Sequence, residues 1–344
     1  MERFRIGKHR IGGPRVYVIA EIGSNHDGKL AQARRMIDLA AKAGADAVKF
    51  QTFRADRLYP ALQFGPRGKP APHPTHEFLK KYELPAAWHA ALKAHADARG
   101  VEFLSTPFDE EAADLLVATG CPAIKIASGD LTHHALLRHV GRKKIPILLS
   151  TGMATIGEID AALGVLRQAG CRKIALLHCV SNYPPDFSQA NVRAVETLRR
   201  AFRCPVGQSD HSPGVAIALA AVALGASIIE KHITPSRALP GPDHPYAMEP
   251  GEFAAMVGEI RRLERALGDG LKVPAPGEVP ERTWARRGVY AIRDVAAGER
   301  LARGDLRALR PNVGVGAEAL DQVVGRKVRR ALRAWQAITR KDLA

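Results

Sequence analysis

Two histidines, His211 and His232, each follow a short apolar stretch within the segment 205–234. A helical run of small residues separates them, and an Asp/Ser/Gly/Pro cluster indicates a turn before that run. A strand, helix and strand of this length form a βαβ unit, whose strands are parallel neighbours. Both histidines are therefore expected at one rim, with Asp210 and Glu230 nearby. They could form half of a divalent-metal site, or they could be solvated strand-end histidines.

Polar side chains also end the other predicted strands. They are Glu21, Lys49, Gln51, Ser105, Thr106, Lys125, Ser128, Asp130, Ser150, Thr151, His178, Asn182, Tyr183 and Ser209. Lysines beside several hydroxyl groups suit an anion such as a phosphate or a carboxylate. The two histidines suit Mn²⁺ or Mg²⁺ acting as a Lewis acid on a carbonyl oxygen. Glu21 is the carboxylate best placed for general acid–base chemistry or for orienting a water.

Each of these residues also has a simpler interpretation. Ser105, Ser150 and Thr151 precede helical patterns and could be helix N-caps. Lys49 or Lys125 could be an exposed lysine, or the Schiff-base nucleophile of a lyase. Because polar residues recur at eight strand ends, the pattern as a whole favours one shared site.

Eight short Val/Ile/Leu-rich stretches alternate with helical patterns and predict the elements that position these residues. The predicted strands are 16–21, 47–50, 101–105, 123–126, 146–150, 174–178, 205–209 and 227–232. The predicted helices are 29–43, 86–99, 109–119, 133–140, 155–168, 190–202, 215–224 and one after Pro250. Eight βα units predict an α/β protein with a (β/α)8 TIM barrel, whose active site would lie at the carboxyl ends of the strands. The first βα turn, GSNHDG, is not a dinucleotide-binding GxGxxG.

The chain is predicted to contain two domains. Residues 1–267 would form the barrel, the Pro- and Gly-rich residues 268–284 a linker, and residues 285–344 a small separate unit. In that unit LARGDL (301–306) and ITRKDL (338–343) match loosely and suggest a pseudo-repeat. The irregular segment 52–85 is long enough to be a lid over the rim.

Composition sets the protein class. The net charge is +16, and the 64 residues from Glu281 onward hold 15 Lys and Arg against 7 Asp and Glu. No nucleic-acid motif accompanies this basic tail, so a nucleic-acid partner is not expected. There is no apolar run of about 20 residues and no signal-peptide core, which predicts a cytoplasmic protein without membrane spans. The four cysteines form no CxxC pair and are expected to be reduced thiols.

Several segments together resemble the sialic acid synthase family, which condenses phosphoenolpyruvate with an N-acylated aldose. They are IAEIGSNHDG (19–28), VKFQTF (48–53), EFLSTPFD (102–109), KIASGDL (125–131), STGMAT (150–155), HCVSNYP (178–184), GQSDHSPG (207–214), EKHIT (230–234) and GPDHPYAMEP (241–250). The region from about Ala285 is similar to the family's antifreeze-like (SAF) domain, a small β-clip. The resemblance covers nearly the whole chain.

The resemblance implies a role for each matching residue. His211 and His232 would hold Mn²⁺ or Mg²⁺, and Glu21 would position or deprotonate the attacking water. The residues expected to hold phosphoenolpyruvate are Lys49, Thr106, Lys125, Ser128, Ser150 and Ser209. Those expected to contact the sugar are Gln51, Asp130, Asn182, Tyr183 and Asp243. Arg287 of the terminal domain would reach the partner's site and meet the N-acyl group, which implies a domain-swapped homodimer.

The expected reaction joins phosphoenolpyruvate, N-acetylmannosamine and water to give N-acetylneuraminate and phosphate. Asp130 stands where the family often has Glu, Gly288 follows Arg287 where Ser is usual, and Ala247 replaces a small hydroxyl residue. These departures leave open a legionaminate, pseudaminate or spore-coat sugar synthase acting on a different aldose, such as a diacetylated dideoxy hexose. The alternative from another class is a non-catalytic saccharide- or nucleic-acid-binding protein.

Overall fold

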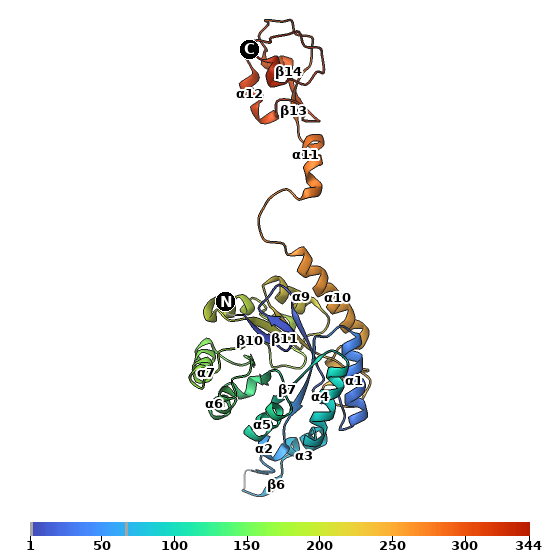
Figure 1. Ribbon diagram of the computed structural model, residues 1–344, viewed down its shortest axis with the longest axis vertical. Helices are drawn as coiled ribbons and strands as arrows, with labels where there is room; N and C mark the ends of the chain where they lie inside the picture. Colours follow the sequence, from blue (N-terminus) through green and yellow to red (C-terminus); the bar gives the residue numbers. More distant parts are fainter. Residues whose placement is uncertain (1–2, 66–67) are drawn as a thin grey trace. The chain divides into compact units, whose positions relative to one another are not determined.

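The computed structural model describes residues 3–65 and 68–344, which divide into two compact units between Gly268 and Asp269. The first unit contains a closed barrel of eight parallel strands surrounded by helices (Figure 1). The barrel strands are β3 (Tyr17–Glu21), β4 (Ala47–Thr52), β7 (Glu102–Pro107), β8 (Ile124–Ile126), β9 (Ile147–Ser150), β10 (Ile174–His178), β11 (Val206–Asp210) and β12 (Ile228–His232). They pair in sequence order, and β12 pairs with β3 to close the barrel. The predicted TIM barrel is confirmed.

Eight longer helices pack outside the barrel. They are α1 (Leu30–Lys42), α4 (His89–Ala98), α5 (Glu110–Ala118), α6 (His134–Arg142), α7 (Ile156–Gln168), α8 (Ala194–Phe202), α9 (Ala216–Ala223) and α10 (Pro250–Ala266). Their starts follow local signals: Asp109 accepts a hydrogen bond from the Ala112 amide at the start of α5, and Thr155 with Glu158 forms a capping box on α7. Each predicted helix is present, although the ends differ by several residues in places.

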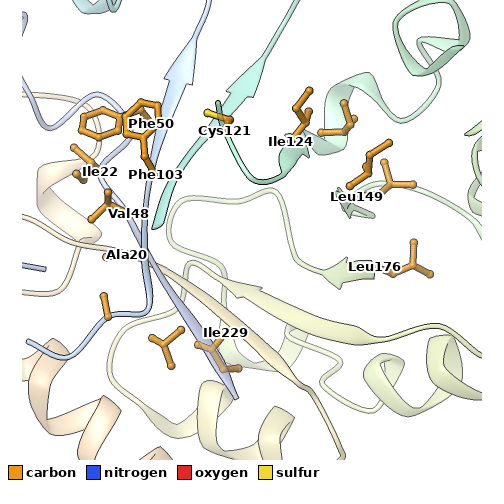
Figure 2. Close-up of a cluster of buried hydrophobic side chains, with 14 of the residues drawn as sticks. Ala20, Ile22, Val48, Phe50, Phe103, Cys121, Ile124, Leu149, Leu176 and Ile229 are labelled. Atoms are coloured by element: carbon orange, nitrogen blue, oxygen red, sulfur yellow. The ribbon is translucent and has the colours of Figure 1, made fainter. Parts of the chain in front are cut away.

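Alternation along the strands divides the apolar residues between two cores. Outward-facing residues of the strands pack against the helices, and Figure 2 shows Val48, Phe50, Phe103 and Ile124 among them. The residues between them face inward and form a second cluster inside the barrel. That interior cluster consists of Phe4, Ile6, Ile11, Tyr17, Ile19, Ala47, Leu104, Ala123, Leu148, Ala175, Leu177 and Ile228. The two-residue repeat of a strand therefore decides which core each side chain joins.

A short antiparallel hairpin, β1 (Phe4–Ile6) and β2 (His9–Ile11), precedes the first barrel strand. Phe4, Ile6 and Ile11 belong to the interior cluster, which includes the first residues of β3, β4 and β12. The hairpin therefore closes the amino-terminal end of the barrel. Strands of three residues show almost no periodicity, so this hairpin was not among the predicted elements.

The segment 52–85 is more regular than its composition suggested. Its elements are α2 (Ala55–Leu58), β5 (Leu62–Phe64), β6 (Pro70–Pro72), α3 (Pro74–Leu79) and a 3₁₀ helix at Lys80–Tyr82. β5 and β6 form an antiparallel hairpin, and His76 of α3 is buried. Local pairing thus orders much of a segment that was predicted to be irregular.

The second unit contains a short helix, α11 (Val279–Ala285), then the antiparallel pair β13 (Gly288–Ala291) and β14 (Leu306–Leu309), and α12 (Leu320–Val323). The segment predicted as a linker therefore includes a helix. The two matching sequence segments form equivalent 3₁₀ turns: Asp305 accepts from the Ala302 amide, and Asp342 accepts from the Thr339 amide. The unit has its own apolar core, which includes Val289, Leu306 and Ile338.

In the part of the chain that the structure describes, no helix is long and apolar enough to cross a membrane. All four cysteines are free, as their spacing predicted.

Candidate functional site

A cavity of about 380 Å³ lies at the carboxyl ends of the barrel strands. The predicted site residues in its lining are Glu21, Lys49, Gln51, Thr106, Lys125, Ser128, Ser150, Tyr183, Ser209, His211 and His232. Further lining residues are Phe108, Ala127, Gly129, Met153, Cys179, Ser181 and Glu230. Residues from widely separated parts of the sequence thus share one pocket.

Strand register explains why these residues meet. Glu21 lies level with Lys49 of β4 on one side and with His232 of β12 on the other. Each of these residues follows, by an even number of positions, a residue of the interior apolar cluster; Lys49, for example, follows Ala47. The inward face of the strands therefore changes from apolar to polar toward the carboxyl ends.

A buried network of charges occupies the bottom of the cavity. Lys49 Nζ lies 2.6 Å from Glu21 Oε2 and 3.8 Å from Glu230 Oε2, and Lys125 Nζ lies 3.5 Å from Glu230 Oε1. Ser209 Oγ donates a 2.8 Å hydrogen bond to Glu230 Oε1. All of these side chains are at least 95% buried. Since buried charges require partners, the four charged groups stabilise one another.

The two acids of this network differ in their pKa values. Burial raises the pKa of Glu21 to about 7, and Glu230 adds to the rise, although Lys49 opposes it. Burial would also raise the pKa of Glu230, but Lys125 and Lys49 outweigh it and hold that pKa at about 2. One carboxylate therefore stays ionised, while the other can exchange a proton near neutral pH.

The rings of His211 and His232 are neighbours in the wall of the cavity, with 5.5 Å between their centroids. His211 Nδ1–H donates to the Val180 carbonyl at 3.0 Å, which leaves its Nε2 as an unprotonated acceptor. His232 Nδ1 is buried without a hydrogen-bond partner among residues 3–65 and 68–344, and lies 3.9 Å from Asp243 Oδ2. Burial lowers the pKa of both rings to about 4. Both imidazoles are thus neutral at pH 7, the form that binds a metal.

Among residues 3–65 and 68–344, no third protein ligand of the usual kind lies beside the two histidines. Within the described ranges, no group of three or more His, Cys, Asp and Glu side chains has the arrangement of a metal site. Asp210, which was expected near the histidines, points to the outside of the barrel and pairs with Lys231. Strand alternation is the reason, because Asp210 is one residue from the inward-facing His211.

Four predicted residues lie outside the cavity lining. Asp243 is next to it and accepts hydrogen bonds from the amide and hydroxyl of Ser24 and from the Tyr246 hydroxyl. Asp130 is half-buried, and burial raises its pKa to about 6. Asn182 is exposed and donates to Gln189, and Arg287 of the second unit donates to the Ala308 carbonyl.

Two other strand-end residues also face outward. Ser105 takes part in a buried hydrogen-bond chain with Thr52 and His89, and His178 Nε2 donates to the Ala190 carbonyl. Neither lines the cavity. The expectation that every polar strand end contributes to the site was therefore too broad.

A close backbone approach fixes the first βα turn beside the histidines. A Cβ on Gly23, whose φ is +53°, would lie 2.6 Å from Asp243 Oδ2 and 3.3 Å from both Glu21 Oε1 and the His232 ring. Only glycine allows the turn to come this close. Glu230, which was expected near the histidines, lines the cavity, because it lies two positions before His232 and so shares its inward face.

The hydroxyl groups of the cavity leave donor capacity for an anion. Ser150 Oγ is buried and has no hydrogen-bond partner in the described part of the chain. Ser128 Oγ accepts from the Gly152 amide at 3.0 Å, and Thr106 Oγ1 accepts from Lys49 at 3.3 Å. With Lys125 beside them, these groups could accommodate a carboxylate or phosphate.

Comparison with known proteins places the chain in a family. Residues 36–272 match the NeuB family, and residues 286–344 match the SAF domain. The N,N'-diacetyllegionaminic acid synthase of Legionella pneumophila is 38% identical over 326 residues, which cover 92% of each chain. The crystal structure of the N-acetylneuraminic acid (sialic acid) synthetase from Leptospira borgpetersenii, in complex with citrate, has a TM-score of 0.75 and 36% identity, and the match covers 81% of this chain and 95% of that one.

A second crystal structure matches over almost the full length of both chains. The spore coat polysaccharide biosynthesis protein spsE of Bacillus subtilis has a TM-score of 0.70 and 36% identity, and the match covers 100% of this chain and 99% of that one. The match to spsE therefore spans both compact units of this chain. The chain belongs to the NeuB family of sialic acid synthase-like enzymes and carries a C-terminal SAF domain.

Proposed function

We propose that the protein condenses phosphoenolpyruvate with an N-acylated aldose and water, giving a nine-carbon sugar acid and phosphate. One observation carries the proposal: two lysines, several hydroxyl groups, two neutral histidines and a carboxyl group of shifted pKa line a single cavity. The lysines and hydroxyls suit the anionic substrate, and the histidines suit a metal bound to the aldehyde.

Phosphoenolpyruvate carries two anionic groups, and the cavity offers separate cations for them. Lys49 and Lys125 lie on β4 and β8, and Glu230 lies between their ammonium groups. Thr106, Ser128, Ser150 and Ser209 would add hydrogen bonds to phosphate and carboxylate oxygens. Ser150 Oγ, buried without a partner in the described chain, is the clearest donor for this role.

The donor set at the histidines fits a divalent ion such as Mn²⁺ or Mg²⁺. His211 presents Nε2, and His232 has an orphaned buried nitrogen, so protein supplies two ligands and the remaining positions stay open to water and substrate. When bound, the ion would supply Lewis-acid polarisation of the aldehyde oxygen. The centroids of the two histidine rings are 5.5 Å apart. Tyr183, whose ring centroid is 4.2 Å from that of His211, covers one side of the histidine pair.

Glu21 is suited to the proton transfers because its pKa is about 7. The methylene carbon of phosphoenolpyruvate forms a bond to the aldehyde carbon, whose oxygen takes up a proton. Water then adds to the former enol carbon while Glu21 accepts one of its protons, which balances the proton taken up by the aldehyde oxygen. The C–O bond to phosphate breaks as the new hydroxyl becomes the ketone and its proton passes to the phosphate. Gln51, which donates to Glu21 Oε1 at 2.9 Å, would hold the carboxylate in place.

The acceptor and assembly belong to the same proposal. N-acetylmannosamine is the first candidate aldose, and Gln51, Asp130, Asn182, Tyr183 and Asp243 are the candidate sugar contacts. A diacetylated dideoxy hexose is the second candidate, favoured by 38% identity to an N,N'-diacetyllegionaminic acid synthase and by Asp130, which stands where the family often has Glu. The proposed assembly is a domain-swapped homodimer in which Arg287 meets the N-acyl group.

A phosphate-release assay tests the proposal. Purified protein with Mn²⁺ and phosphoenolpyruvate should release phosphate only when an N-acylated aldose is added, and the preferred aldose should give the larger kcat/KM. Mass spectrometry of the product should show the aldose plus the three carbons of pyruvate. Saccharide binding without phosphate release from any aldose tested would instead indicate a non-catalytic binding protein.

A further inference from the structure

A buried ion pair lies directly behind the two histidines, on the outer face of the barrel wall. Lys231 and Asp210 are each 2% exposed, and Lys231 Nζ lies 2.5 Å from Asp210 Oδ2. The two residues are level with each other on β12 and β11. Because strand side chains alternate, they point away from the cavity that contains His211 and His232.

The same lysine also holds the backbone beyond His211. Lys231 Nζ donates to the Ser212 carbonyl at 2.5 Å. Asp210 Oδ1 accepts from the Ser212 amide at 2.9 Å and from its hydroxyl at 2.6 Å. The residues on both sides of His211 are therefore tied to Lys231, which is itself bonded covalently to His232.

Burying this ion pair is expected to add little net stability to the barrel wall. Removing a lysine and an aspartate from water carries a large desolvation penalty, and apolar residues of similar volume often give equal or greater stability. A role in geometry accounts for the pair better than a role in stability.

We propose that Lys231 and Asp210 are positioning residues that fix the distance and orientation of His211 and His232 for a divalent cation. The inference rests on the proposed function, since it assumes that these histidines bind the metal. Lys231 acts from the outer face of the barrel wall. It binds the residues on either side of His211 to β12, the strand that presents His232. Only the side-chain torsions of His211 are then left to be fixed, and the hydrogen bond from its Nδ1 to the Val180 carbonyl restricts them.

The test compares Mn²⁺ affinity with folding stability in a double variant. Lys231→Met alone would leave a buried unpaired carboxylate and could prevent folding, so it is combined with Asp210→Asn. The Asn side-chain oxygen can still accept from the Ser212 amide. The full-length double variant should melt close to the wild-type temperature but bind Mn²⁺ at least about tenfold more weakly, measured by loss of the free Mn²⁺ electron paramagnetic resonance signal.

A control variant makes one of these two changes, Asp to Asn, at another buried ion pair. Asp46 is a buried carboxylate that pairs with Arg15 and Arg261 and accepts from the Val18 amide, next to the first residues of the barrel strands. Asp46→Asn should lower the melting temperature without changing Mn²⁺ affinity. Wild-type Mn²⁺ affinity in the double variant would overturn the inference and leave the proposed function standing. Failure of the wild-type protein to bind Mn²⁺ would overturn both.

Discussion

At the amino ends of the barrel strands the interior holds aliphatic side chains covered by the β1–β2 hairpin, whereas at the carboxyl ends it holds lysines, acids and histidines. The change happens within two residues on a strand: Ala47 is followed by Lys49, and Ile228 by Glu230. Only one end of the interior thus gains stability from apolar burial. The other end buries charges, which costs stability unless they are fully paired. The strands therefore separate folding from chemistry along their length.

Loss of the Glu21 carboxylate gives the largest expected effect at the polar end. Glu21→Gln should reduce kcat about 10²- to 10⁴-fold, because it removes the group proposed to accept a proton from water. Its melting temperature should fall only modestly, because Lys49 loses its closest partner but keeps Glu230 at 3.8 Å. Steady-state phosphate release and thermal melting measure the two properties. Activity within twofold of wild type would exclude Glu21 from the proton transfer.

Truncation at the apolar end should show the opposite pattern. Ile6 of the hairpin is fully buried, and Ile6→Ala should cost about 2–5 kcal/mol of unfolding free energy through lost burial and a cavity. Its kcat/KM, assayed well below the melting temperature, should match that of the wild-type protein. Urea denaturation gives the stability. A large activity loss in a folded Ile6→Ala protein would show that the two ends are coupled.

A smaller effect is expected at Asp130, near the rim. Burial raises its pKa to about 6, whereas an unfolded chain ionises near its ordinary value of about 4. The folded state keeps the proton longer, so this group's contribution to stability is lost as the pH rises from about 4 to 6. Asp130→Asn removes that loss. The variant should match wild type at pH 4 and exceed it by about 1–2 kcal/mol at pH 8, after allowance for partial exposure.

Melting curves of both proteins across this pH range make the comparison. If the stability of the two proteins depends on pH in the same way, Asp130 ionises as it does in solvent. That result would also argue against the proposal that Asp130 contacts the sugar.

The barrel was predictable because its strands repeat a strong signal. Each run of Val, Ile and Leu is long enough to show on its own, and eight of them alternate with helices. The hairpin β1–β2 has only three residues per strand and becomes stable by covering the barrel interior, which no local pattern records. The segment 52–85 was misjudged for a related reason: its hairpin contains prolines that oppose a strand prediction.

Strand alternation separates the predicted strand-end residues that line the cavity from those that do not. Lys49, Lys125, His211 and His232 occupy inward positions, as does Glu230, which was expected near the histidines. Asp210 and Ser105 are polar strand-end residues at outward positions, where they form structural contacts. Counting positions in steps of two from a known inward residue would have sorted them. The sequence cannot give the placement of Asp243, because it depends on how a long loop folds back over the first βα turn.

Cys179 gives the polar end of the barrel a chemical reporter. Of the four thiols it alone lines the cavity, 3.0 Å from Ser128 Oγ, while the other three pack among the outer apolar side chains. An alkylating reagent small enough to enter the mouth would therefore modify this residue first, and any molecule filling the pocket would slow the modification. Mass-spectrometric footprinting of one sulfur atom could thus follow occupancy without turnover, even for compounds that the enzyme does not convert.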